Sequence, residues 1–183
     1  MKLKTMLDLL AEASALSGQT DYIVVGSLSI LALEENFEVP HEMAMSNDVA
    51  CYTRADPERI FDVQGELGEH SPRHRSTGCF IDPVSPALPS LPEGWEARLN
   101  AVSGPGVKAW CLDPNDAALS KYARGEPRDR RWIRAGLRAS VVSMPIVRSR
   151  LQRMEFFDQQ EADKARQLID EDEAWFQRGL PQH

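Results

Sequence analysis

The residues that could carry chemistry begin with a Gly-Ser pair and a carboxylate. Gly26-Ser27 follows the apolar run at 22–25, and Asp48 lies in a second strand-like segment at 46–52. Glycine at a strand-to-helix turn lets a ligand approach the backbone closely, and the amides that follow can hold a phosphate. Two carboxylates spaced two residues apart on a strand share a face and can chelate Mg²⁺. Position 50 is Ala50, so the sequence predicts half of such a metal site.

Each of these features also has a simpler explanation. Gly26-Ser27 alone is a common tight turn, and Asp48 alone is a solvated residue on a half-buried strand. Asp82 could supply a metal-binding carboxylate from a third strand. It could equally be a turn residue, since it precedes Pro83.

A second candidate group lies further along the chain. Lys121 is near the end of one expected helix and Asp129 is at the start of the next, joined by a short segment that contains Gly125. That connection brings the two side chains close together. The lysine could then neutralise phosphate charge, and the aspartate could orient it or act as a base. On spacing alone, a helix-end ion pair is the commoner explanation.

Basic side chains surround this second group. Their spacing of three or four residues places many of them on one helix face, which indicates either a solvated surface or a contact with triphosphate or nucleic acid. The arginines are Arg124, Arg128, Arg130, Arg131, Arg134 and Arg138, followed by Arg148, Arg150 and Arg153. Acidic residues concentrate between Glu161 and Glu173.

Cysteines and histidines offer no strong metal motif. The three cysteines, Cys51, Cys79 and Cys111, are widely spaced in strand-like segments and are interpreted as reduced core residues. His70 and His74 are four residues apart in a Gly-, Ser- and Pro-rich segment. That segment, 68–77, is expected to be a mobile loop, with a zinc pair as the alternative.

The elements that must position these residues follow from periodicity. A helix is expected at 3–17 before Gly18, and strands at 22–25, 45–53, 79–84 and 107–112. Asp-Pro pairs at 56–57 and 113–114 are helix starts, and late helices are expected at 114–124, 127–140, 145–153 and 158–178. Strands early and helices late predict an α+β fold. We expect a core over 1–112 and a helical part over 113–183 packed on it.

Composition restricts the class of protein. The hydrophobic share of 42% supports a real core, and no apolar run approaches a membrane-spanning length. The first ten residues lack the long apolar stretch of a signal peptide, so a cytoplasmic location is expected. The net charge of −7 argues against broad coating of nucleic acid.

Several strings together resemble a known group of proteins. They are Tyr-Ile-Val-Val-Gly-Ser at 22–27, Asp-Pro-Glu-Arg at 56–59, Gly-Glu-Leu-Gly at 65–68, Leu-Pro-Glu-Gly-Trp-Glu-Ala-Arg-Leu at 91–99, Trp-Cys-Leu-Asp-Pro-Asn-Asp at 110–116, Ser-Lys at 120–121 and Arg-Asp at 128–129. This set resembles the bacterial nucleotidyltransferase-like proteins related to the AbiEii toxins of abortive-infection and toxin–antitoxin systems. It is most similar to a subgroup of domain-of-unknown-function type.

The resemblance implies a DNA-polymerase-β-like nucleotidyltransferase core, a mixed sheet with an N-terminal helix and a C-terminal helical part. It implies that Gly26, Ser27 and Lys121 bind a nucleoside triphosphate, that Asp48 binds Mg²⁺, and that Lys121 and Asp129 complete the site. The expected function is transfer of a nucleotide to RNA or protein, as a toxin with a cognate antitoxin. Relatives hold an acid at position 50 and often a basic residue at position 126, where this chain has Ala50 and Glu126. The alternative is therefore a degenerate protein that binds a nucleotide or a partner without catalysis.

Overall fold

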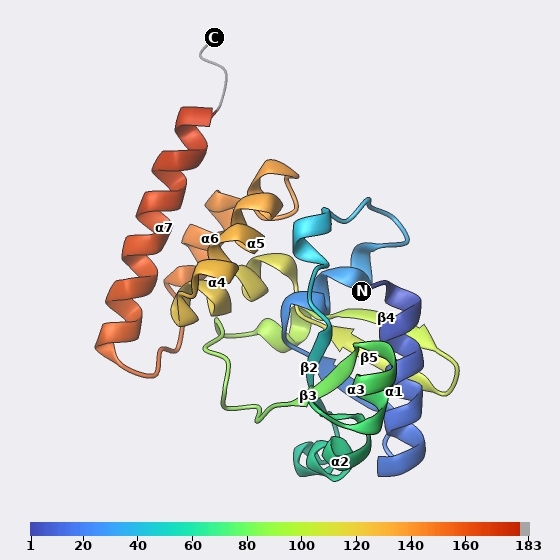
Figure 1. The fold of residues 1–183 in the computed structure, drawn as a ribbon. Helices are drawn as coiled ribbons and strands as arrows, with labels where there is room; N and C mark the ends of the chain where they lie inside the picture. The colour runs from blue at the N-terminus through green and yellow to red at the C-terminus, as the bar shows by residue number, and fades with distance from the viewer. Residues whose placement is uncertain (180–183) are drawn as a thin grey trace. The chain divides into compact units, whose positions relative to one another are not determined.

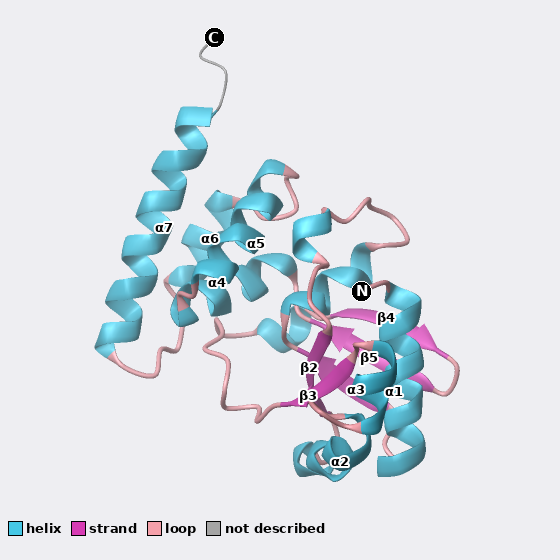
Figure 2. Cartoon of the chain, in the orientation of Figure 1, coloured by secondary structure: helices cyan, strands magenta, loops and turns pink. Residues whose placement is uncertain are grey.

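The computed structural model describes residues 1–179, which form two compact units (Figure 1). Unit 1 comprises Met1–Leu88 and Arg98–Asp113, and unit 2 comprises Pro89–Ala97 and the chain from Pro114 onward. All the strands described belong to unit 1, while unit 2 is built of helices (Figure 2). The predicted α+β fold is confirmed.

Unit 1 is organised around one mixed sheet with the strand order β3-β2-β1-β5-β4. Central strand β1 runs antiparallel to β2 and parallel to β5. β3 runs parallel to β2, and β4 forms an antiparallel hairpin with β5. The strands are β1 (Asp21–Val24), β2 (Asp48–Thr53), β3 (Phe80–Pro83), β4 (Asn100–Gly104) and β5 (Val107–Cys111).

Helix α1 (Leu3–Ser17) covers one face of this sheet. Ser17 Oγ and Tyr22 Oη are 3.0 Å apart, and a Cβ on Gly104 would lie 3.0 Å from Leu7 Cβ. The helix ends at Gly18, whose φ of 71° is the left-handed conformation that glycine adopts readily. Successive side chains of a strand point to opposite faces of the sheet. A residue adjacent in sequence to one that faces α1 therefore points to the other face.

Short helices complete unit 1, and one of them corrects a prediction. They are η1 (Ser27–Leu33), η2 (His41–Met43), η3 (Pro57–Val63), α2 (Gln64–Leu67) and α3 (Pro72–Thr77). The expected loop at 68–77 is wrong over its second half, because α3 occupies it. Ser71 accepts a hydrogen bond from the His74 N–H, and Pro72 takes the first helical position, so the turn-like composition is a helix start.

Unit 2 contains the four late helices, close to their predicted positions. They are α4 (Pro114–Arg124), α5 (Pro127–Arg138), α6 (Met144–Leu151) and α7 (Gln159–Gly179). α7 buries Ala162, Ala165 and Ile169 along one side. The earlier segment Pro89–Ala97 joins this unit through backbone pairing, including Glu93 N–H to the Arg153 carbonyl at 2.9 Å. The short helix η4 (Trp95–Arg98) ends this excursion.

The cysteine interpretation holds for two of the three residues. Cys51 and Cys111 are buried and unbridged, and burial raises the pKa of both thiols, that of Cys111 to about 12. Cys79 is half-buried and precedes β3, so its placement in the core is wrong. No helix within residues 1–179 combines the length and apolar character that crossing a membrane requires.

Candidate functional site

The Gly-Ser turn lies directly against the strand position that lacks its acid. A Cβ on Gly26 would stand 2.8 Å from the Cβ of Ala50, closer than side chains tolerate. The Val25 N–H also donates to the Ala50 carbonyl at 3.0 Å. Only glycine allows this approach, and it brings the start of η1 at Ser27 beside β2.

Two carboxylates occupy the sheet face opposite α1, on neighbouring strands. Ala50 is the register partner of Asp82, while Asp48 pairs with Phe80. Asp82 therefore lies within β3, and the alternative that it is a turn residue is wrong. The strand spacing and rise place the Cα atoms of Asp48 and Asp82 about 8 Å apart on the diagonal.

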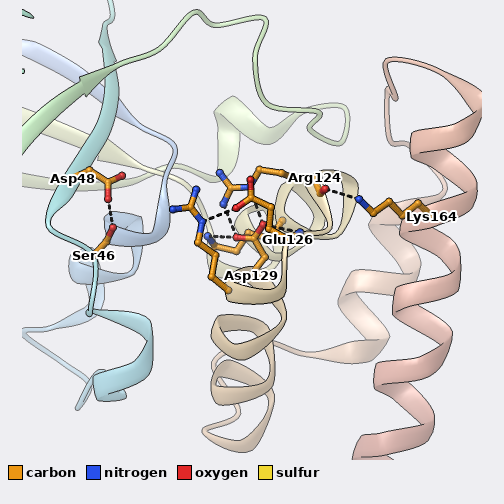
Figure 3. A network of polar contacts seen from close by, with 8 residues as sticks. Ser46, Asp48, Arg124, Glu126, Asp129 and Lys164 are labelled. Atoms are coloured by element: carbon orange, nitrogen blue, oxygen red, sulfur yellow. Dashed lines mark hydrogen bonds and ion pairs between the residues drawn. The ribbon is translucent and has the colours of Figure 1, made fainter. Parts of the chain in front are cut away.

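This donor set fits one shared magnesium ion. Ser46 Oγ donates a hydrogen bond to Asp48 and orients that carboxylate (Figure 3). Within residues 1–179, no group of three or more His, Cys, Asp or Glu side chains could hold a metal by itself. Mg²⁺ commonly binds one or two carboxylates and completes its shell with phosphate oxygens and water. Asp48 and Asp82 are therefore the two residues of this sheet face whose oxygens could hold such an ion.

In unit 2, the α4–α5 connection gathers two cations around one carboxylate. Lys121 Nζ lies 3.3 Å from Asp129 Oδ1, and Arg124 Nε lies 2.8 Å from Asp129 Oδ2. Lys121 and Arg124 are three residues apart, so they share a face of α4. Glu126 caps α5 and Asp129 completes the capping box, which fixes the carboxylate against the helix end (Figure 3).

Burial and the excess of positive charge govern the ionisation of this cluster. Burial and the charge of Arg124 outweigh the attraction of Asp129 and lower the pKa of Lys121 to about 8. Burial would raise the pKa of Asp129, but hydrogen bonds from Arg124 and the charges of Lys121 and Arg124 hold it below its ordinary value. Asp129 is thus a fixed anion near neutral pH.

A pocket of about 250 Å³ opens beside this cluster, and we call it the α4–α5 pocket. Its wall holds two cations and two carboxylates among largely apolar residues. Its lining residues are Lys121, Tyr122, Gly125, Glu126, Pro127, Asp129, Arg130, Ile133 and Leu168. Lys121 and Arg130, the two cations of this wall, are both paired with carboxylates.

Comparison with known proteins decides the family. A family model described as a nucleotidyltransferase of unknown function (DUF6036) matches residues 4–178. The chain belongs to this family. No curated protein and no solved structure gives a match. The nucleotidyltransferase part of the resemblance is confirmed, and the matched range contains all the predicted site residues.

In this DUF6036 protein most of the basic block is neutralised from within. The acidic residues of α7 account for much of the pairing, and the face is not simply solvated. Arg130 pairs with Glu171 and Asp172, Arg134 with Asp172, and Arg148 with Asp170 and Glu173. Arg124 is the member of the block that shares a carboxylate with Lys121.

Two features of the DUF6036 site were missed by sequence reasoning. The bidentate contact of Arg124 with Asp129 was not predicted, although the spacing Lys121, Arg124, Asp129 around Gly125 carries the signal. Asp172 was assigned only to an acidic run, yet it is fully buried. Its spacing does carry a signal, because Asp172 continues the steps of three and four residues set by Ala162, Ala165 and Ile169 on the buried side of α7, whereas Asp170 does not.

Proposed function

We propose that this DUF6036 chain binds a nucleoside triphosphate with Mg²⁺ and transfers its nucleotide to RNA or protein. The observation that carries the proposal is the contact between Gly26 and position 50, with Asp82 in register opposite Ala50. A Gly-Ser turn thereby closes on a sheet face with two carboxylates. The family match adds its support.

Each residue has a role in this reaction. Backbone amides after Gly26 hold phosphate oxygens, and Asp48 and Asp82 hold Mg²⁺. When bound, Mg²⁺ would withdraw charge from the phosphate oxygens. The acceptor hydroxyl attacks the α-phosphorus, the bond to the bridging oxygen of pyrophosphate breaks, and the hydroxyl proton passes to water. In unit 2, Lys121 is the proposed counter-charge for an anionic substrate, and Asp129 holds Lys121 and Arg124 rather than accepting a proton, because these cations keep its pKa below its ordinary value.

Transfer can be measured directly. Purified protein is incubated with α-labelled nucleoside triphosphates, Mg²⁺ or Mn²⁺ and total RNA, and label is counted separately in RNA and protein. We expect label in one fraction, and its loss in Asp48→Asn and in Lys121→Met. Glu58→Gln, an exposed change in η3, is the matched control. Absence of label in every fraction, or equal label in Lys121→Met, would refute transfer.

Ala50 supports a second candidate function, binding without transfer. Loss of one of two metal carboxylates removes much of the charge that holds the ion. The Cβ of residue 50 already fits beside Gly26, so Ala50→Asp adds its carboxylate without a new contact at Cβ. This candidate would be established if calorimetry finds triphosphate binding while the labelling assay finds no transfer by the native chain. Transfer restored in Ala50→Asp would support it further. Native transfer would exclude it.

The role as a toxin of the AbiEii type is part of the proposal, with a cytoplasmic location and a cognate antitoxin protein as its consequences. Induced expression of the native chain is expected to arrest bacterial growth. Lys121→Met, expressed to the same level, is expected to leave growth unchanged. Equal growth of both strains would refute the toxin role. Nucleotide transfer would then still be tested by the labelling assay.

A further inference from the structure

A half-buried tryptophan of unit 1 lies on the same sheet face as the candidate metal carboxylates. Trp110 in β5 is the register partner of Ile23 in β1, and Ile23 pairs on its other side with Tyr52 in β2. Paired residues of neighbouring strands point to the same face, and so do residues two apart along one strand. Tyr52 therefore shares its face with Ala50 and Asp48, and Trp110 shares it with all three.

Two cations lie over the ring of Trp110, and a carboxylate holds its edge. Cζ of Arg54 and Nζ of Lys108 are each 4.2 Å from a ring centroid of Trp110. The indole Nε1–H donates a hydrogen bond to Asp21 Oδ1 at 2.9 Å, which fixes the orientation of the ring. We call these four residues, Trp110, Arg54, Lys108 and Asp21, the Trp110 platform.

The positive charge of this platform is not consumed by ion pairs. Within residues 1–179, neither Arg54 nor Lys108 forms an ion pair with a carboxylate. Asp21 is close enough for both cations to lower its pKa, so it offsets one charge and leaves one positive charge in excess. The adjoining strand β4 adds no carboxylate, because the register partners of the tryptophan and the lysine are Ala101 and Ser103, both exposed.

An aromatic ring beside cations without ion pairs suits single-stranded nucleic acid. Bases stack on aromatic rings and on guanidinium planes, while lysine and arginine contact the phosphates. Base stacking is generally stronger than an exposed cation–π contact, so a base can displace the flexible Lys108 side chain from the ring. The ammonium then meets the adjoining phosphate. A duplex offers no unpaired base to such a ring, and a protein acceptor offers no phosphates.

The distance from the metal carboxylates suits an acceptor strand. Trp110 lies two strand spacings from β2 and four residues along the sheet from Asp48, so the two Cα atoms are about 16 Å apart. Asp82 lies three strand spacings away and two residues along, which is again about 16 Å. At that distance Trp110 cannot touch phosphates held at these carboxylates, whereas an oligonucleotide can cross it.

We propose that the Trp110 platform binds single-stranded nucleic acid and thereby holds an RNA acceptor for the transfer reaction. Trp110 stacks on an unpaired base, Lys108 and Arg54 contact phosphates, and Asp21 is a positioning residue that fixes the indole. The acceptor role rests on the proposed function, whereas binding of the strand is measured without any transfer.

The experiment measures the Kd of a labelled single-stranded RNA of about twelve nucleotides by fluorescence anisotropy, with urea unfolding of each variant. We expect Trp110→Leu to raise the Kd about tenfold, and Trp110→Phe, which keeps a ring for stacking, to raise it less. Trp175→Leu is the matched control and should leave the Kd within about twofold. Trp175 is also half-buried beneath two arginines, Arg134 and Arg138, but it belongs to unit 2.

Other ligands and a cation variant separate stacking from charge. Duplex RNA should bind about tenfold more weakly than the single strand, and single-stranded DNA within about threefold of RNA, since no contact of the platform requires a 2′-hydroxyl. Lys108→Ala should reduce the slope of log Kd against log salt concentration by about 0.7, and it tests the platform even if Trp110→Leu does not fold. In the labelling assay, Trp110→Leu should raise the KM of the RNA about tenfold and leave the KM of the nucleoside triphosphate within about twofold.

The results that would overturn the platform leave nucleotide transfer intact. They are no RNA binding by the native chain, unchanged binding in a folded Trp110→Leu variant, equal weakening in Trp175→Leu, equal binding of duplex RNA, or an unchanged salt slope in Lys108→Ala. RNA bound at least about tenfold more tightly than DNA would place recognition in 2′-hydroxyl contacts outside the platform and overturn it as well. An unchanged KM of the RNA in Trp110→Leu would overturn the acceptor role. Strand binding with no label transfer by the native chain would instead refute the proposed function and leave the binding site standing.

Discussion

The ionisation of Lys121 makes a prediction that needs no ligand. Lys121 is 5% exposed, and its pKa in the folded chain is about 8 against an ordinary 10.5. Between these two values the unfolded chain binds a proton that the folded chain has released. The free energy of unfolding contributed by this group therefore rises with pH across that interval. At about 1.4 kcal/mol per pH unit, the gain is on the order of 3 kcal/mol.

Other groups titrate in the same range with the opposite sign. Burial raises the pKa of Cys51 and Cys111, so unfolded thiols lose protons first and the free energy of unfolding falls with pH. Lys121→Met keeps these thiols and removes the lysine. Subtracting the variant from the native protein therefore isolates Lys121.

The assay is urea unfolding of both proteins at pH 7, 8, 9 and 10, followed by tryptophan fluorescence. Trp132 is a local reporter, since its ring centroid lies 5.0 Å from Lys121 Nζ. We expect the native-minus-variant difference to be flat below pH 8 and to rise above it. A difference that is constant or falling above pH 8 would refute the burial argument. A rising difference would show that the chain keeps this charge at a cost in stability, as functional sites often do.

Three further predictions concern the two candidate groups and one corrected element. Gly26→Ala should destabilise the chain by about 1–3 kcal/mol in urea unfolding, and adding Ala50→Gly should recover most of the loss; no rescue would contradict the contact. The Kd of inorganic triphosphate should rise as pH increases above 8, when Lys121 loses its proton, and Lys121→Arg should flatten that profile; a parallel profile in the arginine variant would assign the effect elsewhere. Ser71→Ala should cost about 1 kcal/mol by loss of the α3 cap, whereas Ser76→Ala at an exposed site should cost less, and equal costs would contradict the capping role.

The features predicted correctly from the sequence are those fixed by local geometry. The pairing of Lys121 with Asp129 follows from two helices with a short glycine turn, because few conformations join them. In the same way, Gly18 predicts where α1 ends, and the pair Asp113-Pro114 predicts where α4 begins. Over such short separations in sequence, the backbone conformation restricts where the side chains can lie.

The features missed depend on contacts distant in sequence. Asp172 meets Arg130 and Arg134 across about forty residues of sequence, and no local rule predicts which arginines a carboxylate on α7 will pair with. The register that sets Asp82 opposite Ala50 depends on strand pairing between segments of different length. Helix α3 was missed because the glycines, serines and proline in and around it are typical of turns.

The excursion of Pro89–Ala97 into unit 2 has a consequence for how this protein can be divided or recombined. The chain enters unit 2, leaves it, and returns at Pro114. Ser90 Oγ bonds to Glu161 Oε2 at 2.8 Å, and Leu91 is only 8% exposed. Cutting the chain at a single point between the units would therefore remove from unit 2 the buried residues that 89–97 contribute to it. Any exchange of unit 2 between relatives therefore has to include the nine residues Pro89–Ala97.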